Sequence, residues 1–167
     1  GGTAPYSGDG TFTVSAGTHN YTVTDANGCT SSTSITVTEP AALVASSTQG
    51  AAILCNGGTT TVTVSSIGGT APYSGDGTFT VTAGTYNYTV TDANGCTSST
   101  SITVSEPTAL VVTATQGADI LCNGGSTTVT VSATGGTSPY TGEGTFTVTA
   151  GTLNYTVTDA NGCTGST

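Results

Sequence analysis

The chain has no lysine and no arginine among its 167 residues, while nine residues are aspartate or glutamate. A chain that carries only negative side-chain charge is repelled by nucleic acid and by anionic membrane surfaces, and it has no cationic side chain for phosphate. We therefore expect no nucleic-acid partner. The absence of lysine also excludes the Lys–Asn isopeptide cross-links that stabilise some bacterial surface domains.

Methionine, tryptophan and long apolar runs are missing too. No run approaches the ~20 apolar residues of a membrane helix, and there is no signal-peptide pattern. We expect no membrane insertion in this segment. The apolar residues instead alternate with threonine and serine, which is typical of β-strands and not of a disordered chain.

What the chain does contain is a repeat. A Gly-Gly-Thr block begins at Gly1 and returns at Gly68 and Gly135, so the period is 67 residues with no insertion or deletion. Such a period indicates one structural unit used several times. It argues against catalysis, because an active site is needed once. The chain starts and stops within a repeat, so we expect it to be part of a longer array.

Two Glu-Pro pairs predict the boundaries between units, because proline ends a strand ladder and stiffens a short junction. These pairs are Glu39-Pro40 and Glu106-Pro107. We define the first module as residues 1–40 (the C-terminal part of a repeat), the second as 41–107 (a complete repeat) and the third as 108–167 (a repeat without its last strand).

Alternating residues in the second module predict six short strands and no helix. Five of them are expected over residues 43–47, 59–66, 78–82, 85–92 and 100–105, with a short extended piece at 71–74. One parity of each strand faces inward. The predicted inward residues are Ile53, Val62, Val64, Tyr73, Phe79, Val81, Tyr88, Val90, Ile102 and Val104. The predicted fold is all-β: small immunoglobulin-like β-sandwich modules in a tandem linear array.

Five cysteines are present: Cys29, Cys55, Cys96, Cys122 and Cys163. No CxxC motif or histidine cluster accompanies them, so disulfides are favoured over a zinc site. Two pairings stay open, besides free thiols. One is internal to each module, Cys55 with Cys96 and Cys122 with Cys163. The other joins Cys55 to Cys163 across a junction, because an immunoglobulin-like strand order puts Cys55 and Cys96 at opposite module ends, ~25 Å apart. The partner of Cys29 is expected outside these residues.

No catalytic, cofactor-binding or metal site is predicted. The single histidine, His19, is replaced by Tyr86 and Leu153 in the other copies, so no Ser-His-Asp set recurs. The recurring carboxylates, of which Asp76 and Asp92 are examples, lie one to a loop, whereas a calcium cage needs several. Asp92 is expected to cap its own turn.

The order of motifs resembles the SprB-type repeat of Bacteroidota cell-surface proteins. The motifs are Cys-Asn-Gly-Gly, Gly-Gly-Thr-Ala-Pro-Tyr, Asn-Tyr-Thr-Val-Thr-Asp-Ala-Asn-Gly-Cys and a closing Glu-Pro. The resemblance covers the whole chain. It implies an immunoglobulin-like fold, export to the bacterial cell surface, and a role in adhesion or gliding.

We therefore expect a structural segment of a long extracellular repeat protein, in a surface stalk, adhesin or filament. Its partners would be adjacent copies of the repeat, with other filament chains or a surface glycan as further options. Exposed threonine rows leave open a polysaccharide- or ice-binding module. The chain is also compatible with a non-catalytic spacer of a secreted enzyme.

Overall fold

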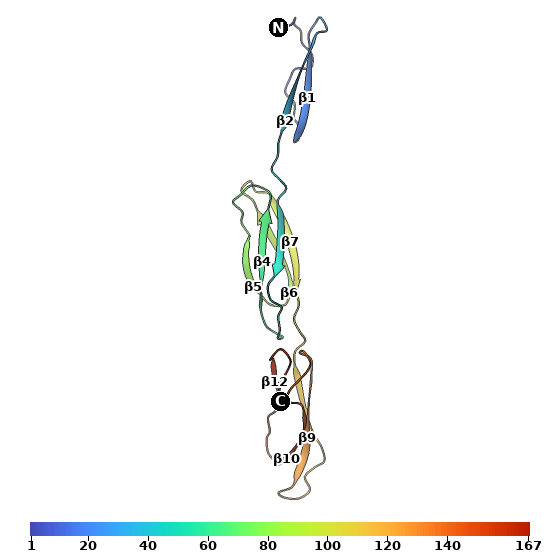
Figure 1. Cartoon of the computed structure of the whole chain (residues 1–167), viewed down its shortest axis with the longest axis vertical. Helices are drawn as coiled ribbons and strands as arrows, with labels where there is room; N and C mark the ends of the chain where they lie inside the picture. Colours follow the sequence, from blue (N-terminus) through green and yellow to red (C-terminus); the bar gives the residue numbers. More distant parts are fainter.

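A computed structural model describes all 167 residues, and it contains only strands, turns and loops. The three modules follow one another along a single long axis, so the molecule is a thin rod (Figure 1). No helix is present that is long and apolar enough to cross a membrane. The strands are β1 (Gly17–Thr24), β2 (Thr30–Val37), β3 (Val44–Gln49), β4 (Thr60–Ile67), β5 (Gly77–Val81), β6 (Gly84–Thr91), β7 (Thr97–Val104), β8 (Val111–Gln116), β9 (Ser126–Thr134), β10 (Gly144–Thr149), β11 (Thr156–Thr158) and β12 (Thr164–Ser166).

The second module contains two antiparallel sheets. Strands β3, β4 and β5 form one sheet in that order, and β6 and β7 form the other. The short piece predicted over residues 71–74 makes only an isolated bridge, from Ser74 to Thr91 at the edge of β6. Pro72 has no N–H to donate to a ladder, which limits pairing there. The module therefore has five strands and not six, in an arrangement consistent with a β-sandwich.

Small aliphatic side chains fill the space between the two sheets. The alternation predicted for β4 is confirmed, because Val62 and Val64 are buried while Thr61 and Thr63 are exposed. The buried cluster consists of Ile53, Val62, Val64, Val81, Val90 and Val104, with Tyr73, Tyr88 and Ile102 partly buried against it. Nine of the ten residues predicted to face inward thus lie in or against this core.

Phe79 is the exception. Its ring is 38% exposed and stacks on Tyr88, with 4.9 Å between the ring centroids. Strand β5 lies at the edge of its sheet, where alternation selects the inner face but the opposite sheet does not cover it fully. Phe79 is therefore not a buried core residue, and the ~3–5 kcal/mol cost of truncating a buried phenylalanine does not apply to it.

The third module repeats this arrangement and the first contains only part of it. Strands β8, β9 and β10 form one sheet, and β11 pairs with a short β12. Residues 1–40 provide the hairpin of β1 and β2, with no strand facing its inner side.

The outer faces of the sheets carry rows of hydroxyl groups. Strand register aligns Thr48, Thr63 and Thr78 across β3, β4 and β5. Neighbouring hydroxyls hydrogen-bond to each other, as Thr63 does to Thr78 at 3.2 Å and Thr85 to Thr103 at 3.0 Å. Such cross-strand pairs stabilise a sheet by a few tenths of a kcal/mol to about 1 kcal/mol each.

Candidate functional site: the junction between modules

One disulfide joins the second module to the third. It connects Cys55 to Cys163, whose Cα atoms are 5.7 Å apart and which are separated by 108 positions in the sequence. Of the two pairings that the sequence left open, the structure therefore contains the one across the junction. The internal pairings of Cys55 with Cys96 and of Cys122 with Cys163 are not formed, and Cys29, Cys96 and Cys122 are free and exposed.

Strand direction explains why the internal pairing fails. Cys55 lies in the loop that follows β3, at the lower end of the second module, whereas Cys96 follows β6 at its upper end. The eight residues of β6 span about 26 Å, far beyond the ~7 Å that a disulfide tolerates between Cα atoms. The lower end of the second module instead meets the upper end of the third (Figure 1).

The lower loop is the Cys-Asn-Gly-Gly motif, a tight turn closed by the N–H of Gly58 donating to the carbonyl of Cys55 at 3.0 Å. Gly57 has a φ of 77°, a conformation in which a side chain is strained. The turn exposes donors that bind the Glu-Pro linker. The backbone N–H of Gly57 donates to the Glu106 carboxylate at 2.7 Å, and the Asn56 amide donates to the same carboxylate at 3.1 Å. The Asn56 amide also bonds the Pro107 carbonyl at 3.0 Å.

The upper loop is the Asp-Ala-Asn-Gly-Cys motif, held rigid by its own aspartate. Asp159 is buried, and its carboxylate accepts the backbone N–H groups of Thr137, Asn161 and Cys163, each at 2.9 Å. The Asn161 amide then reaches across the junction and donates to the carbonyl of Leu54 at 3.1 Å. Asp159 thus fixes the loop that carries Asn161 and Cys163, which bond to Leu54 and Cys55 of the second module.

The same aspartate recurs in each module, with a lowered pKa. The N–H of Thr70, followed by those of Cys96 and Asn94, holds the pKa of the Asp92 carboxyl below its ordinary value, against the opposing effect of burial. The N–H of Thr3 does the same to the pKa of Asp25. Burial is the largest influence on the pKa of Asp159 and raises it, but its N–H donors together prevail and the pKa is lowered. Asp92 therefore caps its own turn as predicted, through Asn94 and Cys96.

We predict that acid destabilises the modules through these aspartates. A carboxyl whose folded pKa is lowered stabilises the fold fully above its unfolded pKa of about 4, and this contribution is lost as the pH falls through the folded value. Circular dichroism melts of the wild type should show a melting temperature that is steady from neutral pH to about pH 5 and falls below about pH 4.

The matched variant is Asp92→Asn, which should melt earlier at neutral pH because the partly buried N–H groups of Thr70, Asn94 and Cys96 lose their charged acceptor. Its deficit relative to the wild type should shrink as the pH falls below about 4, since the wild-type carboxyl is then protonated too. A deficit that stays constant down to about pH 2 would show that the charge of Asp92 does not contribute.

A second prediction concerns Glu106. We expect Glu106→Ala to make the Cys55–Cys163 bond about fivefold easier to reduce in a glutathione buffer, equivalent to about 1 kcal/mol for partly exposed charge-assisted hydrogen bonds. The control is Glu39→Ala, because Glu39 occupies the same place at the other junction and makes no hydrogen bond. Equal reduction of both variants would mean that Glu106 does not position the lower loop.

The other residues singled out in the sequence lie outside this junction. His19 is half-buried, and its Nε2 hydrogen-bonds the Ser15 carbonyl at 2.8 Å. Asp76 accepts the hydroxyl of Ser66, and Glu143 accepts the N–H of Ala133. No three His, Cys, Asp or Glu side chains gather around one point that could hold a metal ion.

Sequence reasoning missed the polar half of the junction. It singled out the cysteines and the Glu106-Pro107 pair, but it did not predict the binding of Glu106 by Asn56 and Gly57, nor the hydrogen bond from Asn161. A signal was present, since an Asn-Gly step adjoins the cysteine in both of the cysteine-containing motifs. No known family model matches the chain, and no curated protein sequence matches it.

Proposed function

We propose that the chain is a structural segment of a long extracellular repeat protein, which forms a stiff surface stalk, adhesin or filament. The observation that carries this proposal is the junction between the second and third modules. There a disulfide, a bound Glu-Pro linker and a hydrogen bond between loops all act on the same pair of module ends.

Three attachments act on residues 54–57 of the lower loop, and together they would restrain bending and twisting at the junction. The linker alone would act as a hinge, although proline narrows its freedom. Glu106 fixes the linker to the lower loop, and the disulfide fixes the lower loop to the upper loop of the next module. In a linear array, stability then depends on each module and on its interfaces with its neighbours. A stiff spacer is the function that such interfaces favour.

An extracellular location is supported by the disulfide, because such bonds persist in oxidising compartments. The SprB-type order of motifs adds the bacterial cell surface and immunoglobulin-like modules to this proposal. Under it, the partners of each module are the adjacent copies of the same repeat. Other chains of a filament, or a surface glycan, would be contacted by the outer faces of the sheets.

Electron microscopy of the purified chain tests the proposal. We expect straight, thin particles in which the second and third modules keep one relative orientation. Reduction combined with Glu106→Ala should introduce a bend at that junction. Oxidised wild-type particles that bend freely between these two modules would contradict a stiff stalk.

The hydroxyl rows favour a second candidate, a module that binds polysaccharide or ice. The third module repeats the three-strand row of the second, with Thr115, Thr130 and Thr145 in register. Adjacent strands lie about 4.8 Å apart, which gives a regular hydroxyl lattice. Because many of these hydroxyls already bond to each other, a structural role accounts for them. A glycan array and an ice-affinity assay on the chain decide whether the rows also bind a ligand.

A further inference from the structure

The inner face of the first module is an open apolar groove. The hollow has a volume of about 700 Å³, and its apolar lining consists of Phe12, Val14, Tyr21, Val23, Ile35 and Val37. In the second module the corresponding face is covered by the sheet of β3, β4 and β5. Val14 is 37% exposed, for example, whereas its equivalent Val81 is 9% exposed. The groove therefore has the shape and chemistry of a surface built to be covered by a repeat's own front strands.

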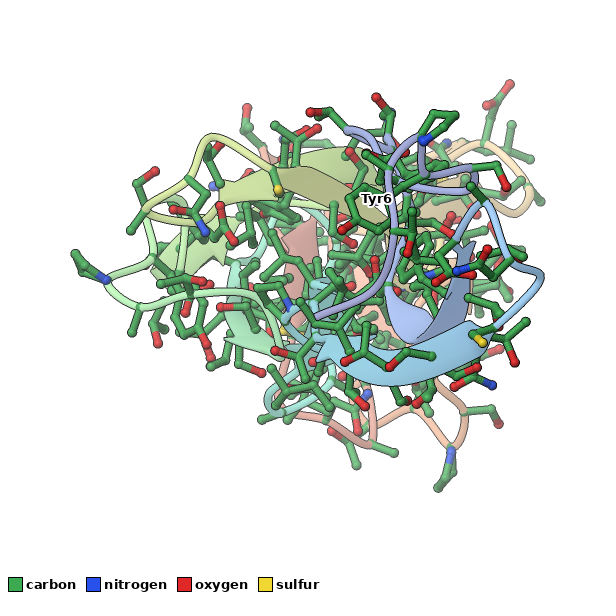
Figure 2. The ribbon with its side chains drawn as sticks, turned by 90° about the horizontal axis from the view of Figure 1, so that it is seen from above. Tyr6 is labelled. Atoms are coloured by element: carbon green, nitrogen blue, oxygen red, sulfur yellow. A yellow bond between two sulfur atoms is a disulfide. The ribbon has the colours of Figure 1, made fainter.

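The view down the rod onto this module shows Tyr6 at the near end (Figure 2). Tyr6 is 45% exposed, whereas the equivalent Tyr73 is partly buried against the core of the second module. Both hydroxyls donate to a glycine carbonyl four or five residues earlier, Tyr6 to Gly2 and Tyr73 to Gly68. The loop also keeps the bridge from Ser7 to Thr24, which is the equivalent of the bridge from Ser74 to Thr91. Because this pairing is retained, we attribute the greater exposure of Tyr6 to the lack of a sheet facing β1 and β2.

Three groups at the junction below this groove also lack their partners. Glu39, Asn94 and Cys96 are the equivalents of Glu106, Asn161 and Cys163, which hold residues 54–57 at the occupied junction. Glu39 makes no hydrogen bond, Cys96 is a free exposed thiol, and the Asn94 amide bonds only to Thr70 within its own module. The junction between the first and second modules thus has the same three groups, but no loop equivalent to residues 54–57 is bound to them.

In the second module, one continuous segment, residues 41–67, covers the inner face of the module and also contacts the junction groups Glu106, Asn161 and Cys163. Its β3 runs beside β7, where the Ala45 N–H donates to Ser98 and the Ser47 hydroxyl bonds Thr100, both at 3.0 Å. Its β4 contributes the buried side chains of Val62 and Val64, and the loop between β3 and β4 contributes Cys55. In the first module the equivalents of Ser98 and Thr100 are Ser31 and Thr33, whose side chains are exposed and make no hydrogen bond.

We propose that the groove of the first module, together with Glu39, Asn94 and Cys96, is one acceptor site for the front part of a repeat. The occupant is a segment with the sequence of residues 41–67, which covers the equivalent face of the second module. Its valines fill the groove and its Cys-Asn-Gly-Gly turn seats against Glu39. This inference rests on the proposed function and gives it a rule of assembly: each cysteine of a lower loop pairs with the cysteine 108 positions later, as Cys55 does with Cys163.

Bond formation at the site needs an oxidant, for which a small-molecule disulfide such as oxidised glutathione suffices. The segment's thiolate displaces one glutathione and forms a mixed disulfide. The Cys96 thiolate then attacks the segment's sulfur and releases the second glutathione. The two protein thiols lose two electrons and two protons, and the oxidant gains them as two glutathione thiols.

The test adds a synthetic peptide of residues 41–67 to the intact chain in a glutathione redox buffer. The peptide carries a short lysine tail at its amino end for solubility, because the segment has no charged residue. Mass mapping of non-reduced fragments, cut at aromatic or acidic residues, then counts the cross-links at each free cysteine. We expect at least about tenfold more peptide on Cys96 than on Cys29 or Cys122, since only the Cys96 site has the groove and Glu39 beside it.

Two matched controls separate docking from simple thiol reactivity. A peptide with Val62→Asn and Val64→Asn should lose the preference for Cys96, because it cannot fill the groove. A peptide with Cys55→Ser should still slow hydrogen exchange in β1 and β2 of the chain. Equal yields at the three cysteines, or joining of two chains in place of peptide capture, would overturn the acceptor site. Either result would leave the stalk proposal standing if micrographs still show straight rods.

Discussion

Reduction of the Cys55–Cys163 disulfide should lengthen the chain under tension by about 360 Å, the extended length of the 108-residue interval that the bond closes. In the oxidised chain, tension entering at Pro40 passes along β3 to Cys55, crosses to Cys163 and continues along β12. Strands β4 to β11 lie within the closed loop and carry no tension. The path from Pro40 to Cys55 is short and includes the six residues of β3, which are already extended, so it has little length to release.

Optical tweezers with peptide-tag handles at the two termini measure this length directly. The oxidised wild type should release only residues outside the loop, and addition of a phosphine reductant should add the remainder. Cys55→Ser is the matched control and should give the long extension without reductant, whereas Cys122→Ser should leave the oxidised length unchanged because Cys122 is free. The same length for oxidised wild type and Cys55→Ser would mean that the bond does not carry tension.

The second large effect is expected on the stability of the second module when one buried valine is truncated. Val90→Ala should cost the second module about 2–3 kcal/mol, from lost apolar burial and the cavity left behind. Val90 is fully buried in a cluster of only six buried residues. A unit of this size has a total stability of about 3–10 kcal/mol, so the loss is a large fraction of it.

The repeat supplies its own controls for this substitution. Val157, the equivalent residue in the third module, is also fully buried, and Val157→Ala should cost its module about as much. Val23, the equivalent in the first module, is only partly buried because no sheet faces it, so Val23→Ala should cost less than about 1 kcal/mol. Hydrogen exchange followed separately in the strands of each module measures the three losses. Equal losses at all three positions would show that the facing sheet does not determine the cost.

Much of the fold could be predicted because it depends on local alternation. A strand with one apolar parity exposes a single face that must be covered, and the alternation of residues along the strands is enough to identify Val62, Val64 and Val90 as core residues. Alternation failed at Phe79 because it specifies a side and not the reach of the opposite sheet. It also overestimated the piece around Pro72, where side chains suit a strand but the backbone lacks a donor.

The sequence by itself determined the all-β class, the 67-residue period and the residues that face inward, since each of these follows from spacing along one chain. Only the tertiary structure decided which cysteines pair and what binds the Glu-Pro linker. Spacing along the chain does not specify distance in space. Cys96 is nearer than Cys163 to Cys55 in the sequence, but the loops that carry Cys55 and Cys96 lie at opposite ends of the second module. Cys163 is 108 positions away, and it is brought within 5.7 Å of Cys55, Cα to Cα, because consecutive modules meet end to end.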